Sequence, residues 1–179
     1  MSSLAHSLVS WSEFQQLPER PESAQRYELH DGEVVAVPPA KPIHIKIQRR
    51  IEKLLESIVG DWGVVTKEFP YRPQPNLQFW VSDVACLSQA HWDSMPSDEY
   101  PVFAPPLVIE VLSPSNTPAK TSRQRIVALS SGTEEFWVVD PVGRTVTVTR
   151  PSGTTLYRAG DMISVLQFET PVSVDAIFA

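Results

Sequence analysis

The chain has little cysteine, no excess of basic charge and no long hydrophobic run, and each shortage excludes a class of protein. Its 179 residues include one cysteine, Cys86, so no intramolecular disulfide can form and a reducing, cytoplasmic location is expected. The net charge of −6 argues against tight, non-specific binding of nucleic acid, which needs a basic surface. No signal-peptide pattern and no apolar stretch long enough to span a bilayer occur, so we expect no membrane association.

An acidic balance does not exclude a nuclease, because an acidic metal site itself lowers the net charge and basic patches can persist locally. With 42% hydrophobic and 20% charged residues, the chain can bury a core of its own. At this length we expect one domain that spans residues 1–179.

Hydrophobic periodicity predicts a mixed α/β (α+β) domain with a central sheet flanked by helices. The turn pair Asp31-Gly32 predicts a hairpin over residues 27–37, and residues 88–106, rich in proline, are expected to form a surface excursion. The C-terminal part is expected to continue as short strands. Helices are predicted at 11–17, 47–58 and 118–131, and further strands at 62–69, 77–87, 107–112, 134–140 and 145–149.

Two carboxylates interrupt strands that are otherwise apolar. Asp83 lies within residues 79–87 and Glu110 within residues 107–112, both rich in β-branched or aromatic side chains. An ionised carboxylate in a buried strand loses its hydration at high cost, and a divalent metal shared by the two would offset that cost. The pair therefore indicates metal-dependent hydrolysis, with phosphodiester cleavage as the leading case. The alternative is that backbone N–H groups or an arginine hold each carboxylate.

Several stretches carry a resemblance to a known family, and they occur in the family's order. They are residues 27–33, His44 at the opening of a helix, residues 82–84, the run Ile-Glu-Val-Leu-Ser-Pro-Ser at 109–115 and the run Glu-Phe-Trp-Val-Val-Asp-Pro at 135–141. Together they resemble a bacterial family of restriction-endonuclease-like proteins within the PD-(D/E)XK nuclease superfamily. The resemblance covers residues 10–179.

The resemblance implies a restriction-endonuclease-like fold and a DNA endonuclease that depends on Mg²⁺ or Mn²⁺. It implies that Asp83 and Glu110 bind the metal, together with the carbonyl of Val111, and that Glu28 matches an assisting acidic position. An exposed hairpin residue is an equally good interpretation of Glu28. Members of the superfamily are often dimers, so a homodimer is also expected.

One departure from the family is chemical. The family lysine in the helix after the glutamate strand corresponds to Gln124, which can form hydrogen bonds but carries no charge. Lys120 lies one helical turn earlier on the same face, and we predict that it takes over the role of orienting water and offsetting charge on phosphate. Two milder departures are Ser82 in place of a proline and Ala128 in place of an aromatic residue.

The missing lysine leaves two functions open. The first is a divalent-metal DNA endonuclease that uses Asp83, Glu110, Glu28 and either Lys120 or Gln124. The second is a catalytically inactive nuclease fold that binds nucleic acid or protein. The two differ in whether the chain cleaves DNA in the presence of a divalent cation.

Overall fold

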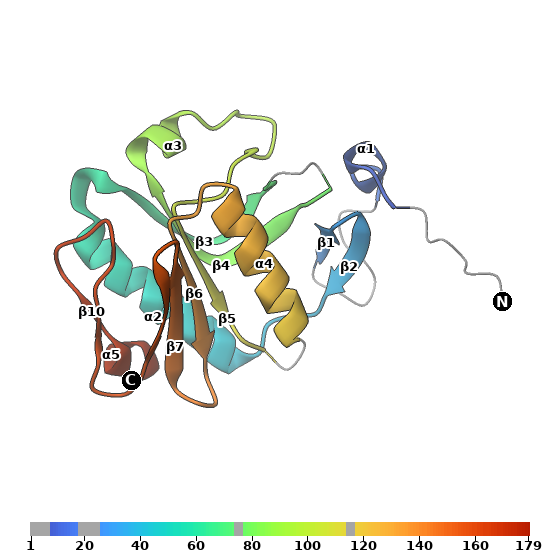
Figure 1. The fold of residues 1–179 in the computed structure, drawn as a ribbon. Helices are drawn as coiled ribbons and strands as arrows, with labels where there is room; N and C mark the ends of the chain where they lie inside the picture. The colour runs from blue at the N-terminus through green and yellow to red at the C-terminus, as the bar shows by residue number, and fades with distance from the viewer. Residues whose placement is uncertain (1–7, 18–25, 74–76, 114–116) are drawn as a thin grey trace.

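A mixed six-stranded sheet forms the centre of the computed structural model, which describes residues 8–17, 26–73, 77–113 and 117–179 (Figure 1). Among the neighbouring strands described in this sheet, β5 and β6 form the one parallel pair, and the other pairs are antiparallel. Helix α4 makes the crossover that a parallel pair requires. This architecture confirms the predicted fold class. In spatial order the strands are β3 (Gly63–Tyr71), β4 (Trp80–Ser88), β5 (Leu107–Val111), β6 (Glu135–Asp140), β7 (Thr145–Arg150) and β8 (Gly153–Tyr157).

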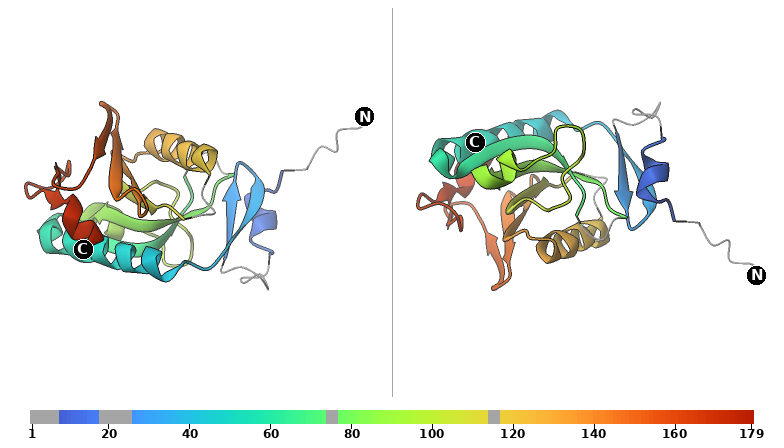
Figure 2. Two further views of the ribbon diagram at one scale, coloured as in Figure 1. Left: turned by 90° about the horizontal axis from the view of Figure 1, so that it is seen from below. Right: turned by 90° about the horizontal axis from the view of Figure 1, so that it is seen from above.

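Helices α2 (Pro42–Val59) and α5 (Val174–Phe178) cover one face of this sheet, and α4 (Pro118–Ser130) covers the other (Figure 2). Helix α2 buries Ile47, Ile51 and Leu55, which recur at the helical period predicted from the sequence. These side chains pack with alternate residues of β4 to β7 and with α5 to form the largest hydrophobic core. The amphipathic pattern of α2 therefore decides which of its faces meets the sheet.

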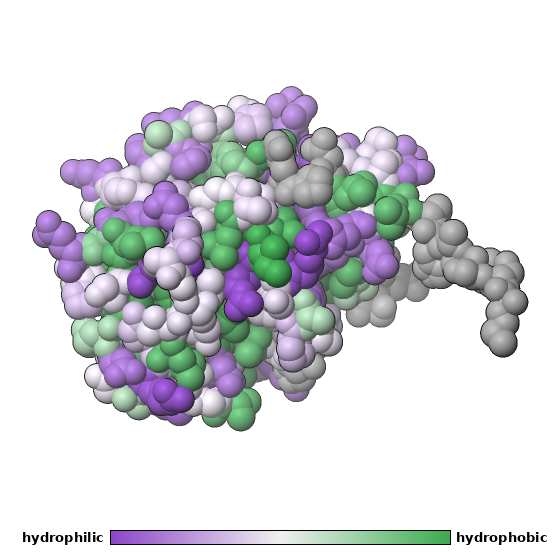
Figure 3. Space-filling model, viewed as in Figure 1, coloured by the Kyte–Doolittle hydropathy of each residue, from purple (hydrophilic) through white to green (hydrophobic). Residues whose placement is uncertain are grey.

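Helix α4 begins after Thr117, whose side chain accepts a hydrogen bond from the backbone N–H of Lys120. It buries Val127 and Ala128 in a second core on its own side of the sheet. Its outer surface is mixed, with Ile126 exposed, and Figure 3 shows hydrophobic and hydrophilic residues side by side over this helix. Ala128 is completely buried. The small side chain that stands in place of the family's aromatic residue therefore lies at a packed position.

A hairpin of β1 (Arg26–His30) and β2 (Glu33–Val37) lies beside the sheet. Its turn places Asp31 at φ 51° and Gly32 at φ 82°, as a tight two-residue turn with two left-handed positions requires. Leu29 pairs with Phe79 just before β4, which anchors the hairpin there. The predicted hairpin is thus confirmed, and its attachment brings Glu28 near the start of β4.

Three sequence-based boundaries need correction. Helix α1 (Trp11–Phe14) ends earlier than residue 17, and Pro18, its predicted stop, lies outside the described residues. Residues 88–106 are not only a surface excursion. They include the short helix α3 (Gln89–Asp93) and a buried stretch at 104–106, where Ala104 packs into the second core.

The C-terminal part is not made of strands alone. It contains β9 (Met162–Ile163) and β10 (Val172–Ser173) and then ends in α5, which is too short to show a helical period. The remaining element is the 3₁₀ helix η1 (Gly60–Trp62). Within the described ranges, no helix is long and apolar enough to cross a membrane.

Candidate active site

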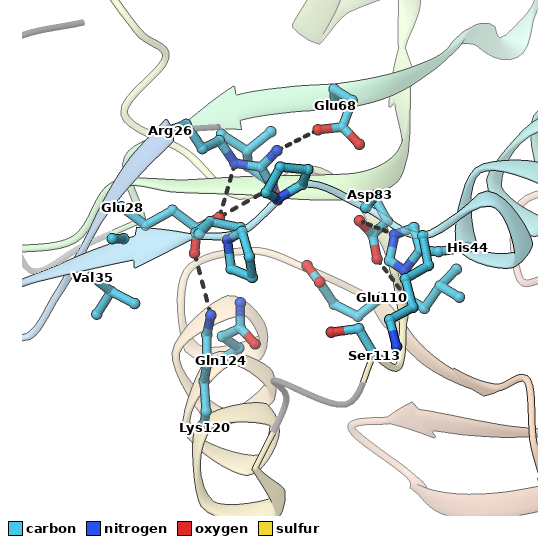
Figure 4. Close-up of a pocket in the computed structure, with 18 residues that line it drawn as sticks. Arg26, Glu28, Val35, His44, Glu68, Asp83, Glu110, Ser113, Lys120 and Gln124 are labelled. Carbon is cyan, nitrogen blue, oxygen red and sulfur yellow. Dashed lines mark hydrogen bonds and ion pairs between the residues drawn. The ribbon is translucent and has the colours of Figure 1, made fainter. Parts of the chain in front are cut away.

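A cavity of about 310 Å³ lies where the β1–β2 hairpin, the start of α2, β4, β5 and α4 meet (Figure 4). The strands that carry the two carboxylates are neighbours in the sheet, as the sequence predicts. All the residues singled out from the sequence line this one cavity: Glu28, Asp83, Glu110, Val111, Lys120 and Gln124. Residues up to 96 positions apart in the sequence, Glu28 and Gln124, therefore share one site.

Asp83 is buried and held in one orientation by three donors. His44 Nε2 and Gln48 Nε2 each lie 2.9 Å from its Oδ1, and the backbone N–H of Val111 donates to Oδ2 over 2.6 Å. One of the three donors is a backbone N–H group, so the alternative interpretation of Asp83 is correct for that one contact. A carboxylate offers about four lone pairs, so Asp83 can still accept a cation in this orientation.

Glu110 is buried to a similar degree, 6% exposed, but its environment is different. Its Oε1 has no hydrogen-bond partner among the described residues. Burial raises the pKa of Glu110 well above its ordinary value, and the negative charges of Asp83 and Glu28 raise it further. The positive charges of Lys120 and Arg26 act to lower this pKa but do not outweigh burial and the two carboxylates.

Glu135 shows what a purely structural buried carboxylate looks like in this protein. It is fully buried on β6, yet Arg150 Nε donates to its Oε2 over 2.8 Å and the backbone N–H of Leu166 over 3.2 Å. Trp137 Nε1 donates to the other oxygen. The contrast with Glu110 matters because a buried polar atom without a partner is costly and unusual in a native fold.

Glu28 is 3% exposed, so the interpretation of it as an exposed hairpin residue is wrong. Arg26, His30 and Lys120 surround its carboxylate, with Lys120 Nζ 3.6 Å from Oε2. Burial acts to raise the pKa of Glu28, but the hydrogen bond from His30 and the charges of Lys120 and Arg26 outweigh it and lower the pKa. Glu28 is therefore an ionised group in contact with Lys120.

Lys120 and Gln124 lie one turn apart on α4 and both line the cavity. Arg123, on the same helix, instead pairs with Asp31, and its Nε lies 2.8 Å from Oδ2. Arg123 is therefore engaged outside the cavity. Among the positively charged residues of α4, Lys120 is thus the one that lines the cavity.

Sequence reasoning missed several residues that contact the carboxylates. The sequence analysis places His44 at the opening of a helix but assigns no contact with Asp83 to His44 or to Gln48. Both lie on the buried face of α2 together with Ile47, and a polar pair at i, i+4 on an apolar face is the signal that could have identified them. Arg26 and Glu68, which form an ion pair at the cavity wall, gave no such signal.

The donor set fits a divalent cation by its chemistry. Mg²⁺ and Mn²⁺ prefer carboxylate and carbonyl oxygens, and the cavity offers those of Asp83 and Glu110, including the unpartnered Oε1. In the part of the chain that the structure describes, no group of three or more His, Cys, Asp or Glu side chains forms a complete metal site. Any further ligands must therefore come from other groups or from solvent.

Comparison with known proteins gives a match to a family model and matches to solved structures. The family model Uma2, described as "Putative restriction endonuclease", matches residues 11–178. The chain is also similar to the crystal structure of "a putative nuclease belonging to DUF820" from Anabaena variabilis, with a TM-score of 0.82 and 23% identity over 95% of this chain and 97% of that chain. This likeness shows a common fold. No curated protein matches the sequence. The resemblance found in the sequence is thereby confirmed, and the chain belongs to the Uma2 family of restriction-endonuclease-like proteins.

Proposed function

We propose that this protein is a divalent-metal-dependent endonuclease that hydrolyses phosphodiester bonds in DNA. The observation that carries the proposal is the cavity in which Asp83 and Glu110 meet while one oxygen of Glu110 has no partner. A structural role would call for donors around Glu110, as around Glu135. Membership of a nuclease family supports the same assignment.

Asp83 and Glu110, with the carbonyl of Val111, would hold Mg²⁺ or Mn²⁺. When bound, such a cation polarises the scissile phosphate and lowers the pKa of a coordinated water. His44 and Gln48 keep Asp83 in one orientation, so that little rearrangement is needed when the cation binds. Glu110 must release its proton to act as a ligand, because its raised pKa favours the neutral acid in the absence of a cation.

Lys120 takes the role of the family lysine in this proposal. Glu28 holds its ammonium group at the cavity, and the long side chain allows it to reach a phosphate oxygen there. A positive charge near the reacting phosphate stabilises the negative charge that develops during hydrolysis. Glu28 is then a positioning residue that acts through Lys120.

The test is metal-dependent cleavage of supercoiled plasmid DNA by the purified protein, with Mg²⁺ and Mn²⁺ in parallel and with EDTA as the blank. We expect nicked or linear product with the wild type and none with Asp83→Asn. Asp93→Asn, a change at an exposed carboxylate on α3, is the matched control and should cleave like the wild type. Equal cleavage by Asp83→Asn and the wild type would overturn the assignment.

A second candidate function is a catalytically inactive nuclease fold that binds DNA or protein. Gln124 at the position of the family lysine favours this function. The ion pair between Lys120 and Glu28 also favours it, because Lys120 is the positively charged residue of α4 that lines the cavity and its charge is already paired. It predicts DNA association in a mobility-shift assay without cleavage under any metal condition. Cleavage that depends on Asp83 would exclude it.

The proposal includes a homodimer. Strand β8 is the last strand of the sheet, residues 153–156 are exposed and Leu156 is 43% exposed, so a second copy could pair along this edge. Sedimentation velocity of the wild type and of Leu156→Pro, which removes a backbone donor from the free edge of β8, tests the pairing. A wild-type monomer at all concentrations would contradict it.

A further inference from the structure

Gln124 is a buried polar side chain of the cavity with an unpaired acceptor. It is 3% exposed, and its Oε1 is buried without a hydrogen-bond partner among the described residues. Leaving such an acceptor unsatisfied destabilises the folded protein. A buried amide that keeps this cost in a folded protein indicates a ligand that the protein alone does not provide.

Glu110 Oε1 is a second unpartnered acceptor in the same cavity. Two acceptors of this kind call for a donor or a cation. The nearest positive charge on α4, that of Lys120, is already in contact with Glu28 at 3.6 Å. Figure 4 shows the side chains of Lys120 and Gln124 projecting from α4 toward the cavity. The unmet demand is therefore for a donor or a cation at these two oxygens.

We propose that Gln124 provides an additional oxygen ligand for the divalent cation at Asp83 and Glu110. This inference rests on the proposed metal-dependent function. Amide oxygens are ordinary ligands of hard cations, whereas a lysine at this position would repel the ion. The replacement of the family lysine by Gln124 thus converts a positive charge next to the site into a ligand of the site.

The replacement of the family lysine by Gln124 also agrees with the position of Lys120, one helical turn from Gln124 on α4. A cationic side chain contributes to phosphate binding from a distance, because its charge acts over several ångströms. A neutral amide oxygen acts only on direct contact with the ion. In this proposal Lys120 acts on the phosphate and Gln124 acts on the cation.

The experiment is a titration of Mn²⁺, followed by calorimetry and by the loss of the free-ion electron paramagnetic resonance signal. It is made with and without a short phosphorothioate oligonucleotide. Gln124→Met keeps the length of the side chain and removes the oxygen, and we expect affinity to fall about tenfold. Gln124→Glu should bind more tightly than the wild type. Gln89→Met, a change at an exposed glutamine on α3, is the matched control and should not alter affinity.

The outcomes separate this inference from the proposed function. Wild-type binding that is lost in Asp83→Asn but unchanged in Gln124→Met overturns the inference alone. No Mn²⁺ binding by the wild type, with or without the oligonucleotide, overturns both. If Gln124→Met does not fold, Gln124→Asn keeps the amide but withdraws it by one methylene, and wild-type affinity in that variant again overturns the inference.

Discussion

The backbone N–H of Val111 donates a hydrogen bond to Oδ2 of Asp83 over 2.6 Å. The ladder between β4 and β5 has its last pair at Val84 and Ile109, so this N–H lies beyond the regular pairing of the two strands. The side chain of Asp83 accepts it in place of a strand carbonyl. Because Val111 directly follows Glu110, the bond also fixes the two site carboxylates relative to each other.

Removal of the Asp83 carboxylate should destabilise the fold as well as the site. In Asp83→Ala, the donors of His44, Gln48 and Val111 lose their acceptor, and we expect the free energy of unfolding to fall by about 3 kcal/mol. Asp83→Asn keeps one acceptor oxygen and should lose less. Urea denaturation measures both. Asp93→Ala, on the surface, should change stability by no more than about 0.5 kcal/mol, and an equally stable Asp83→Ala would contradict the network.

Lys120 should carry most of the positive charge used on the substrate. We expect Lys120→Met to reduce the rate of plasmid cleavage by about 10²-fold at saturating Mg²⁺, while Lys120→Arg keeps part of the activity. The surface variant Arg123→Met breaks only the pair with Asp31 and should cleave like the wild type. Unchanged cleavage by Lys120→Met would mean that Lys120 has no role in the reaction.

A double variant tests whether position 124 can still serve the family role. Lys120→Met/Gln124→Lys moves the positive charge one turn along α4, to the place of the family lysine. We expect cleavage at saturating Mg²⁺ to recover at least about tenfold over Lys120→Met alone, because the charge again lies in the cavity. Single-turnover rates on one plasmid preparation provide the measurement, and no recovery would show that a positive charge at position 124 does not replace that of Lys120.

Glu110 should make the metal-free protein less stable as pH rises. Its pKa is raised in the folded state, so between the ordinary value of 4.5 and the folded value the folded chain holds a proton that the unfolded chain has released. The stability contributed by that proton is present at low pH and is lost as pH rises through the folded pKa. Urea unfolding with EDTA across the pH range should show this loss in the wild type but not in Glu110→Gln.

Glu135 provides the opposite case on the same sheet. Its carboxylate is paired with Arg150 and accepts two further hydrogen bonds, so Glu135→Gln leaves Arg150 without its charge partner. We expect a loss of roughly 3 kcal/mol at neutral pH, since breaking a buried pair costs about that much. Thermal or urea unfolding measures it. If both Glu110→Gln and Glu135→Gln were equally destabilising, the distinction between a functional and a structural carboxylate would fail.

Much of the fold follows from local sequence patterns. The period of Ile47, Ile51 and Leu55 predicts α2 and its buried face, and Asp31-Gly32 predicts the hairpin turn. Such patterns are readable because they reflect the repeat of a single helix or strand. The boundaries and short elements, such as α5, were not predictable, because five residues carry too little periodicity and their burial depends on the packing of distant strands.

The sequence by itself determined that two carboxylates interrupt apolar strands and that glutamine replaces a family lysine. It could do so because a charged residue in a buried strand is costly wherever the strand lies. Only the tertiary structure decided that His44 and Gln48 hold Asp83 and that Glu28 is buried against Lys120. It also decided that one oxygen each of Glu110 and Gln124 has no hydrogen-bond partner among the described residues. These contacts join α2, β1, β5 and α4, and no local pattern encodes them, because hydrogen-bond partners are set by distances in space.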